Sequence, residues 1–140
     1  MELLCQTNRC RPPADMIVSK RKNTMILITG GAYQGKSFFA EQLREEAVQN
    51  GMSAPPVTKD IHLLVAREIK AGRDPYPLFE RMISGHPDII FTVDELGCGI
   101  VPADASDREW RETTGRICCR LAQRAEAVYR VTCGIAERIR

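Results

Sequence analysis

The sequence predicts an α/β fold in which a small, mainly parallel sheet lies between two layers of helices. Two short apolar runs, residues 25–28 and 89–93, are typical of strands buried on both faces of a parallel sheet. Segments with the periodicity of amphipathic helices separate and follow these runs. The stretch from Gly30 to Ser37, G-G-A-Y-Q-G-K-S, fits the pattern G-x-x-x-x-G-K-[ST]. Together these observations predict a P-loop NTPase-like three-layer sandwich.

The loop after the first apolar run has the residue types that a phosphate-binding loop needs. Gly30 and Gly35 allow backbone conformations that a Cβ would block, so that successive N–H groups can face an anion. Lys36 can reach the outer phosphates, and Ser37 can offer a hydroxyl to Mg²⁺. The alternative is a glycine-rich turn with an incidental lysine, but the strand before it and the helix after it favour phosphate binding. The predicted nucleotide-binding residues are Gly30, Gly31, Ala32, Tyr33, Gln34, Gly35, Lys36, Ser37 and Phe38.

Three amphipathic helices are predicted between this loop and the second apolar run. They extend from Ser37 to Asn50, from Thr58 or Asp60 as N-cap to Gly72, and from Asp74 to Gly85. The connection between the first and second helices contains prolines and has room for only a brief strand.

The second apolar run ends at Asp94 and Glu95. Because the carboxyl ends of parallel strands open on the same side of a sheet, this pair can face the phosphate-binding loop. Asp94 is the predicted Mg²⁺ partner of Ser37, and Glu95 is the predicted base or water-organising residue. A solvated acidic turn is the alternative. Residues 96–102 contain two glycines and are expected to form either a loop that moves on binding or a plain connection.

A fourth helix is predicted for residues 107–126. Arg108, Arg111 and Gly115 share one face of it, and Arg116 lies at the edge of that face. Two arginines beside a position without a side chain can clamp a phosphate, because a guanidinium group matches paired oxygens. Solvated arginines on an ordinary helix face are the alternative.

Composition and charge narrow the class of protein. Residues 25–140 are predicted to be one domain that ends with a strand and a short edge segment, and residues 1–24 to be a disordered extension. A net charge of +2 gives no argument for a nucleic-acid partner, and no apolar run is long enough for a membrane helix. We therefore expect a cytoplasmic protein whose six cysteines are reduced thiols without a metal.

Two blocks of the sequence resemble the adenosylcobinamide kinase/adenosylcobinamide-phosphate guanylyltransferase family of cobalamin biosynthesis. One is M-I-L-I-T-G-G-A-Y-Q-G-K-S-F-F-A-E, and the other contains E-L-G-C-G-I-V-P, R-E-W-R-E-T-T-G-R and C-G-I-A-E-R-I-R. The second block is the more diagnostic one, because no general rule for nucleotide binding requires it. The resemblance implies phosphorylation of the aminopropanol hydroxyl of adenosylcobinamide with ATP or GTP. It adds functional weight to Glu95, Arg108, Arg111 and Arg116. With the lysine of the loop, the predicted catalytic residues are Lys36, Glu95, Arg108 and Arg111.

The chain is shorter than the pattern of this family between the first helix and the second apolar run. The family then transfers GMP through a guanylylated histidine that lies in this stretch, and the shortening is expected to remove it together with a strand that ends in an acidic residue. His62 and His86 are the only histidines. A core or helix-surface role is the more common one for His62, and the alternative is a residue that contacts substrate or acts as a nucleophile. Arg116 is a further possible contact to substrate.

The leading functional hypothesis is a phosphotransferase that uses Mg²⁺ and acts on a corrinoid. The alternatives are a non-catalytic module that binds GTP or ATP, and a P-loop kinase for another small hydroxyl compound. A sheet with few strands exposes its edges and encloses little space, so we also expect a homo-oligomer with the acceptor site at a subunit junction.

Overall fold

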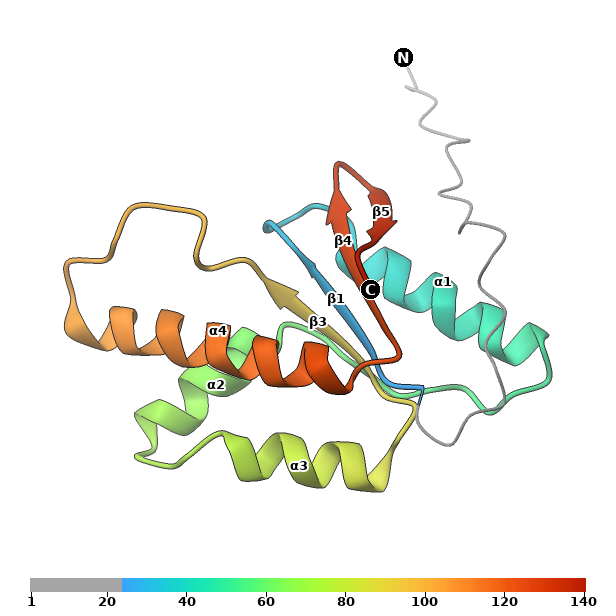
Figure 1. The fold of residues 1–140 in the computed structure, drawn as a ribbon, viewed down its shortest axis with the longest axis horizontal. Coiled ribbons are helices and arrows are strands. Elements are labelled where there is room, and N and C mark those ends of the chain that lie inside the picture. Colours follow the sequence, from blue (N-terminus) through green and yellow to red (C-terminus); the bar gives the residue numbers. More distant parts are fainter. Residues whose placement is uncertain (1–23) are drawn as a thin grey trace, which may run out of the picture.

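Five strands form one mixed sheet in the computed structural model, which describes residues 24–140 (Figure 1). The strands are β1 (Ile26–Gly30), β2 (Val57–Thr58), β3 (Ile90–Asp94), β4 (Ala127–Thr132) and β5 (Ile135–Arg138). Their order is β2-β3-β1-β4-β5, and every neighbouring pair is parallel except β4 and β5. The predicted α/β class with a mainly parallel sheet is confirmed.

Helices cover both faces of this sheet and make three layers. They are α1 (Lys36–Gln49), α2 (Ile61–Lys70), α3 (Tyr76–Gly85) and α4 (Ala105–Arg124). Helix α1 packs on one face through Phe39, Ala40 and Leu43. The other three helices lie on the opposite face (Figure 1), where they bury a larger apolar cluster. The predicted extension falls almost wholly on residues 1–23, which lie outside the described residues, as do Cys5 and Cys10.

The region before α2 contains the brief strand that the sequence leaves room for, and its position matters for function. Strand β2 pairs with β3, and Asp60 lies two residues after the end of β2. Asp60 does not cap α2 with its side chain: it has a left-handed backbone with φ 54°, and its N–H donates to Thr92 Oγ1 at 3.0 Å. That bond ties Asp60 to β3.

The end of α2 is stabilised by an ion pair between the buried carboxylate of Glu68 and the exposed guanidinium group of Arg73, which leads to a prediction about pH. Arg73 donates two hydrogen bonds to Glu68, at 2.8 and 2.9 Å, and these lower the Glu68 pKa from 4.5 to about 2. The folded state therefore binds fewer protons than the unfolded state below pH 4.5, and the stability gained from the pair is lost as the pH falls from 4.5 towards 2. Acid unfolding followed by circular dichroism should show a weaker pH dependence in Glu68→Gln than in the wild type. Equal slopes would contradict this.

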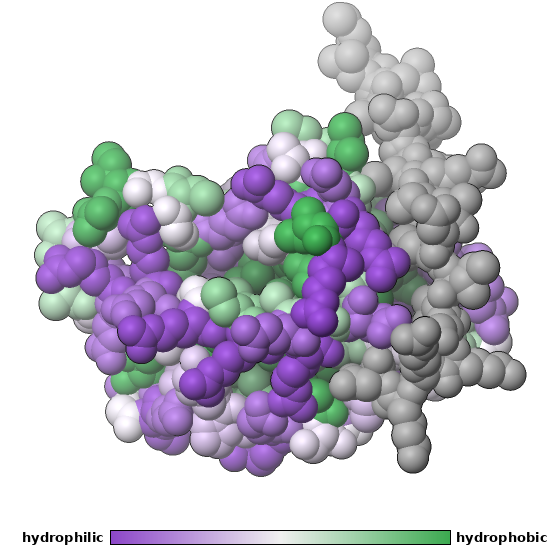
Figure 2. Space-filling view, viewed as in Figure 1, coloured by the Kyte–Doolittle hydropathy of each residue, from purple (hydrophilic) through white to green (hydrophobic). Residues whose placement is uncertain are grey.

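The surface is mostly hydrophilic over α4, whereas hydrophobic surface lies along the loop between β3 and α4 (Figure 2). In that loop Ile100 is 95% exposed and Val101 is 69% exposed. Within residues 24–140, none of the helices has both the length and the hydropathy of a membrane-spanning helix.

Candidate active site

The loop between β1 and α1 lines a cavity of about 460 Å³. The backbone turns through positive φ angles at Gly30 (155°), Tyr33 (57°) and Gly35 (95°). In the described part of the chain no side chain caps the first turn of α1, so its backbone N–H groups remain available to a ligand. This space, called here the loop cavity, is lined by residues 32–38 together with Asp60, His62, Leu63 and Asp94. An uncapped helix N-terminus facing a cavity is a favourable site for an anion.

Gly30 cannot be replaced without moving the sheet. A Cβ at this position would lie 2.4 Å from the carbonyl oxygen of Val131 in β4, and the φ of Gly30 already disfavours other residues. We expect Gly30→Ala to lower the free energy of unfolding by more than about 2 kcal/mol. The matched control is Gly31→Ala, whose Cβ would meet only the flexible Gln34 side chain, at 3.4 Å. Denaturant titration measures both, and equal stability of the two variants would contradict the prediction.

The turn between β4 and β5 holds the loop in place. Gln34 Oε1 accepts a hydrogen bond from the N–H of Cys133 at 2.7 Å, and the backbone carbonyl oxygen of Gln34 accepts one from the N–H of Gly134 at 2.9 Å. Gly134 also approaches Gly35 so closely that a Cβ on Gly35 would lie 3.4 Å from its Cα. The far end of the chain is therefore part of the support of the loop cavity.

Lys36 and Asp94 form an ion pair inside this cavity. Lys36 Nζ lies 2.6 Å from Asp94 Oδ1 and donates to the carbonyl oxygen of Gly31, also at 2.6 Å. Lys36 is only 5% exposed. The ammonium group of Lys36 is thus already paired with two groups of the site, the carboxylate of Asp94 and the backbone carbonyl of Gly31. A nucleotide phosphate that reaches Lys36 competes with Asp94 for it.

His62 contacts Asp94 from α2. Its Nδ1 accepts the backbone N–H of Asp94 at 3.3 Å, and its Nε2 lies 3.6 Å from Asp94 Oδ2. The hydrogen bond to Nδ1 requires the tautomer with the proton on Nε2, which faces the carboxylate. Trp110 of α4 donates to the carbonyl oxygen of His62 at 2.7 Å and fixes this residue further. Both ring nitrogens of His62 therefore face Asp94, an arrangement that can position this carboxylate.

Asp60 is a site residue that the sequence analysis considered only as a helix cap. One ligand atom each of Asp60, His62 and Asp94 lies within 4.8 Å of the others. Asp60 follows β2 and Asp94 ends β3, so both carboxylates come from the carboxyl ends of adjacent parallel strands. Carboxylate and hydroxyl oxygens are the donors that Mg²⁺ prefers, so Ser37, Asp60 and Asp94 fit such an ion by their chemistry.

Glu95 has a partner that changes its expected role. Arg130 of β4 donates two hydrogen bonds to its carboxylate, both at 2.9 Å. This guanidinium group is the main reason why the pKa of Glu95 is lowered, with Cys98 and Lys36 contributing. A carboxylate with a lowered pKa is a weaker base. Glu95 also does not line the loop cavity, which argues against the predicted role as base.

The predicted arginine face of α4 does not meet the loop cavity. Arg108 donates to the carbonyl oxygens of Pro102 and Ala103, at 2.9 and 2.6 Å. Arg111 donates to those of Gly97 and Ile100, at 2.5 and 3.3 Å. These two side chains therefore hold the loop between β3 and α4, which corrects the expectation that they form a free phosphate clamp.

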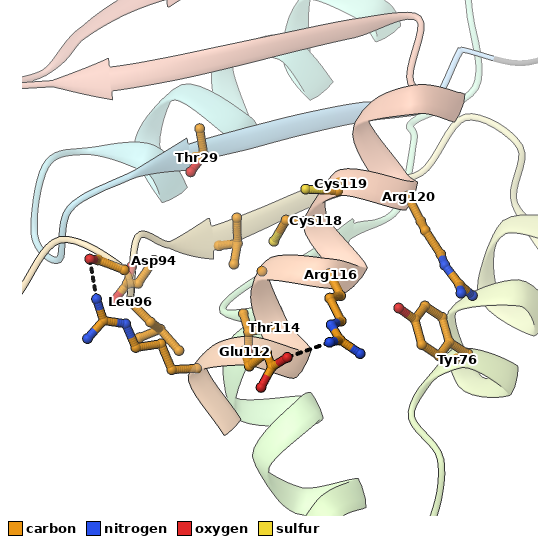
Figure 3. Close-up of a pocket in the computed structure, with 14 residues that line it drawn as sticks. Thr29, Tyr76, Asp94, Leu96, Glu112, Thr114, Arg116, Cys118, Cys119 and Arg120 are labelled. Atoms are coloured by element: carbon orange, nitrogen blue, oxygen red, sulfur yellow. Dashed lines mark hydrogen bonds and ion pairs between the residues drawn. The ribbon is translucent and has the colours of Figure 1, made fainter. Parts of the chain in front are cut away.

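A second cavity, of about 620 Å³, lies between α4 and the ends of β1 and β3 (Figure 3). We call it the α4 cavity. From the strands it is lined by Thr29, Val93 and Asp94, and from α4 by residues 111–120 apart from Thr113 and Ile117. Arg116, one of the charged side chains that line this cavity, is paired with Glu112, as Figure 3 shows. Asp94 lines both cavities, so it stands at the boundary between them.

The structure thus brings together part of the predicted site. Residues 32–38, His62 and Asp94 lie around the loop cavity, with Lys36 at its centre. Arg111 and Arg116 line the adjoining α4 cavity, whereas Arg108 lines neither. Lys36 thus lines one cavity and Arg111 the other, and Asp94 lines both.

Comparison with known proteins assigns the chain to a family. The family model described as cobinamide kinase / cobinamide phosphate guanyltransferase matches residues 57–139, which is more than half of the 140 residues. The chain belongs to this family. The predicted resemblance is therefore confirmed at the level of the family. No curated protein matches the chain.

The matched segment of this cobinamide kinase / guanyltransferase family runs from β2 to β5. It contains Asp60, His62, Asp94 and the arginines of α4, and it includes the turn between β4 and β5 that bonds to Gln34. The loop from Gly30 to Ser37 precedes it. The match therefore covers one side of the loop cavity, and the glycine-rich loop adds the other side.

Proposed function

We propose that the protein is a phosphotransferase that moves the γ-phosphoryl group of ATP or GTP to the hydroxyl group of a cobinamide. The observation that carries this proposal is the position of Asp94, which lines both cavities while its carboxylate lies 2.6 Å from Lys36. A nucleotide in the loop cavity and an acceptor in the adjoining space would meet at this residue. Family membership supplies the acceptor class.

The residues have distinct roles in this proposal. The loop amides and Lys36 bind the phosphates, and the exposed apolar residues Tyr33, Phe38 and Leu63 at the loop cavity are available to the rest of the nucleotide. Ser37 and Asp60 would hold Mg²⁺, which offsets negative charge on the phosphates when bound. Asp94 is then left to orient the acceptor hydroxyl, with His62 keeping its carboxylate in place.

The transfer itself exchanges one bond to phosphorus for another. The acceptor oxygen forms a bond to the γ-phosphorus, and the bond to the β,γ-bridging oxygen breaks with its electron pair left on the diphosphate. The hydroxyl proton passes to the Asp94 carboxylate, which stands at the boundary between the two cavities. Glu95 and Arg130 support the end of β3 without taking part.

GMP transfer is not included in the proposal. The ring nitrogens of His62 are both engaged with Asp94, and His86 is exposed in the turn after α3, away from the loop cavity. A histidine that forms a covalent intermediate needs a free nitrogen that faces the phosphorus.

Labelled nucleotides test the proposal directly. The full chain is incubated with adenosylcobinamide, Mg²⁺ and either γ-labelled or α-labelled GTP or ATP. We expect the γ label on the corrinoid and no α label on protein or corrinoid. Tight nucleotide binding without transfer would favour a non-catalytic module, and an α label on the protein would favour a guanyltransferase. Transfer to other alcohols but not to adenosylcobinamide would point to a kinase with a different acceptor.

Subunit association is a separate part of the proposal. Strand β2 has two residues and β5 is mostly exposed, so within residues 24–140 no further strand pairs with either edge of the sheet. We expect light scattering to give a mass above that of one chain, and a monomeric mass would contradict this.

A further inference from the structure

Gly115 lies in the interior of α4, and nothing in the described part of the chain explains why a glycine is present there. Helix α4 runs for 20 residues, and Gly115 is near its middle. Glycine is the poorest helix former apart from proline, so a glycine there needs a compensating reason. A Cβ added to Gly115 would have no atom of the described chain within 4 Å. No neighbouring side chain of the described chain therefore requires a glycine at this position. Gly115 does line the α4 cavity, and a ligand in that cavity would require one.

The neighbouring Thr114 gives a second, independent sign of a ligand. This residue is 2% exposed, and its Oγ1 has no hydrogen-bond partner within residues 24–140. A buried hydroxyl without a partner is costly, so such groups are usually satisfied. Thr114 lines the same cavity, on the side of α4 that faces the strands (Figure 3). A ligand in the cavity could supply the missing partner.

Each of the three arginines of α4 that line the cavity has a partner within the protein. Arg116 is paired with Glu112 at 2.5 Å, and Arg111 donates to two loop carbonyls. Arg120 stacks on the ring of Tyr76, 3.8 Å from its centroid. Apolar surface from Val93, Leu96 and Cys118 completes the lining. Aliphatic carbons that carry hydroxyl or amide groups suit a lining that combines apolar surface with a few polar groups.

We propose that the α4 cavity binds the hydroxyl-bearing arm of the acceptor, an uncharged aliphatic chain with alcohol and amide groups. The arm lies along the backbone of Gly115, its polar group bonds to Thr114, and its hydroxyl reaches Asp94 at the inner end. This inference rests on the proposed function, because it takes the acceptor from it. A cavity of about 620 Å³ holds a group of drug size, so the arm enters while the macrocycle stays outside. The arm then needs no second subunit.

Three variants of the full chain test this assignment. Gly115→Ala places a methyl group in the cavity, and Gly85→Ala is its matched control, because a Cβ at the end of α3 also meets no atom within 4 Å and lines neither cavity. Thr114→Val removes only the unpartnered hydroxyl. Adenosylcobinamide binding is measured by equilibrium dialysis without nucleotide, nucleotide binding separately, and the melting temperature by circular dichroism.

We expect Gly115→Ala to weaken adenosylcobinamide binding by about tenfold or more, since a filled site resists an added methyl group. Its melting temperature should stay equal or rise, and its nucleotide affinity should not change. Thr114→Val should weaken corrinoid binding by about fivefold while raising the melting temperature. Gly85→Ala should leave both affinities unchanged.

The outcomes separate this inference from the proposed function. Equal adenosylcobinamide affinity of Gly115→Ala and Gly85→Ala would overturn the inference, as would absence of binding to the wild type. Binding that Gly115→Ala weakens and Gly85→Ala does not would support it, even if the wild type transferred no γ label and the proposed kinase activity failed.

Discussion

Replacement of Lys36 by methionine is expected to lower the rate constant of phosphoryl transfer by about 10³-fold. Lys36 is the cation at the centre of the loop cavity, and its ammonium group is held at 2.6 Å from both Asp94 and the carbonyl oxygen of Gly31. Charge develops on the transferred group and its leaving oxygen in the transition state, and a fixed cation stabilises it most where water is excluded. Methionine keeps the length of the side chain but not the charge.

Steady-state kinetics with γ-labelled nucleotide and adenosylcobinamide measure this loss. Lys59→Met is the matched control, because Lys59 pairs with Glu41 at the surface and is 44% exposed. The control should keep its kcat within about twofold, as expected for an exposed ion pair. A Lys36→Met enzyme that retained a tenth of the wild-type kcat would show that the loop cavity does not bind the transferred phosphate, and the proposed mechanism would fail.

The sheet and its buried strands could be predicted because their information is local. Runs of apolar residues specify β1 and β3, and the glycine spacing after β1 specifies the loop. Strand β2 left little signal, because it has two half-buried residues after a proline-rich connection. The strand matters for the site because its pairing with β3 places Asp60 beside Asp94. The sequence could therefore suggest a brief strand here, but not its neighbour in the sheet.

The partners of the charged residues could not be predicted for a related reason. Glu95 pairs with Arg130, which is 35 residues away, and Asp94 contacts His62, which is 32 residues away. These contacts depend on the order of strands and helices rather than on spacing in the sequence. Helical spacing did place Arg108 and Arg111 on one face, but it does not reveal that the loop before α4 folds back to accept their hydrogen bonds.

The exchange of partners at Lys36 leads to a prediction in which affinity and rate change in opposite directions. In the nucleotide-free structure Asp94 neutralises Lys36, so a triphosphate has to displace this carboxylate. Asp94→Asn removes the competing charge while keeping the size of the side chain. We therefore expect Asp94→Asn to bind nucleotide at least as tightly as the wild type when Mg²⁺ is absent.

The same substitution is expected to lower kcat for adenosylcobinamide phosphorylation by about 10²–10⁴-fold, the usual contribution of a positioned proton acceptor. Asp88→Asn is the control, because Asp88 precedes the other end of the same strand and lines neither cavity. Calorimetric titration with nucleotide and transfer of the γ label measure the two effects. If Asp94→Asn weakened nucleotide binding and kcat together, Asp94 would act as a support of the loop instead of a group that faces the acceptor. If only the rate fell, the carboxylate that separates the two cavities would be the group at which nucleotide and acceptor meet.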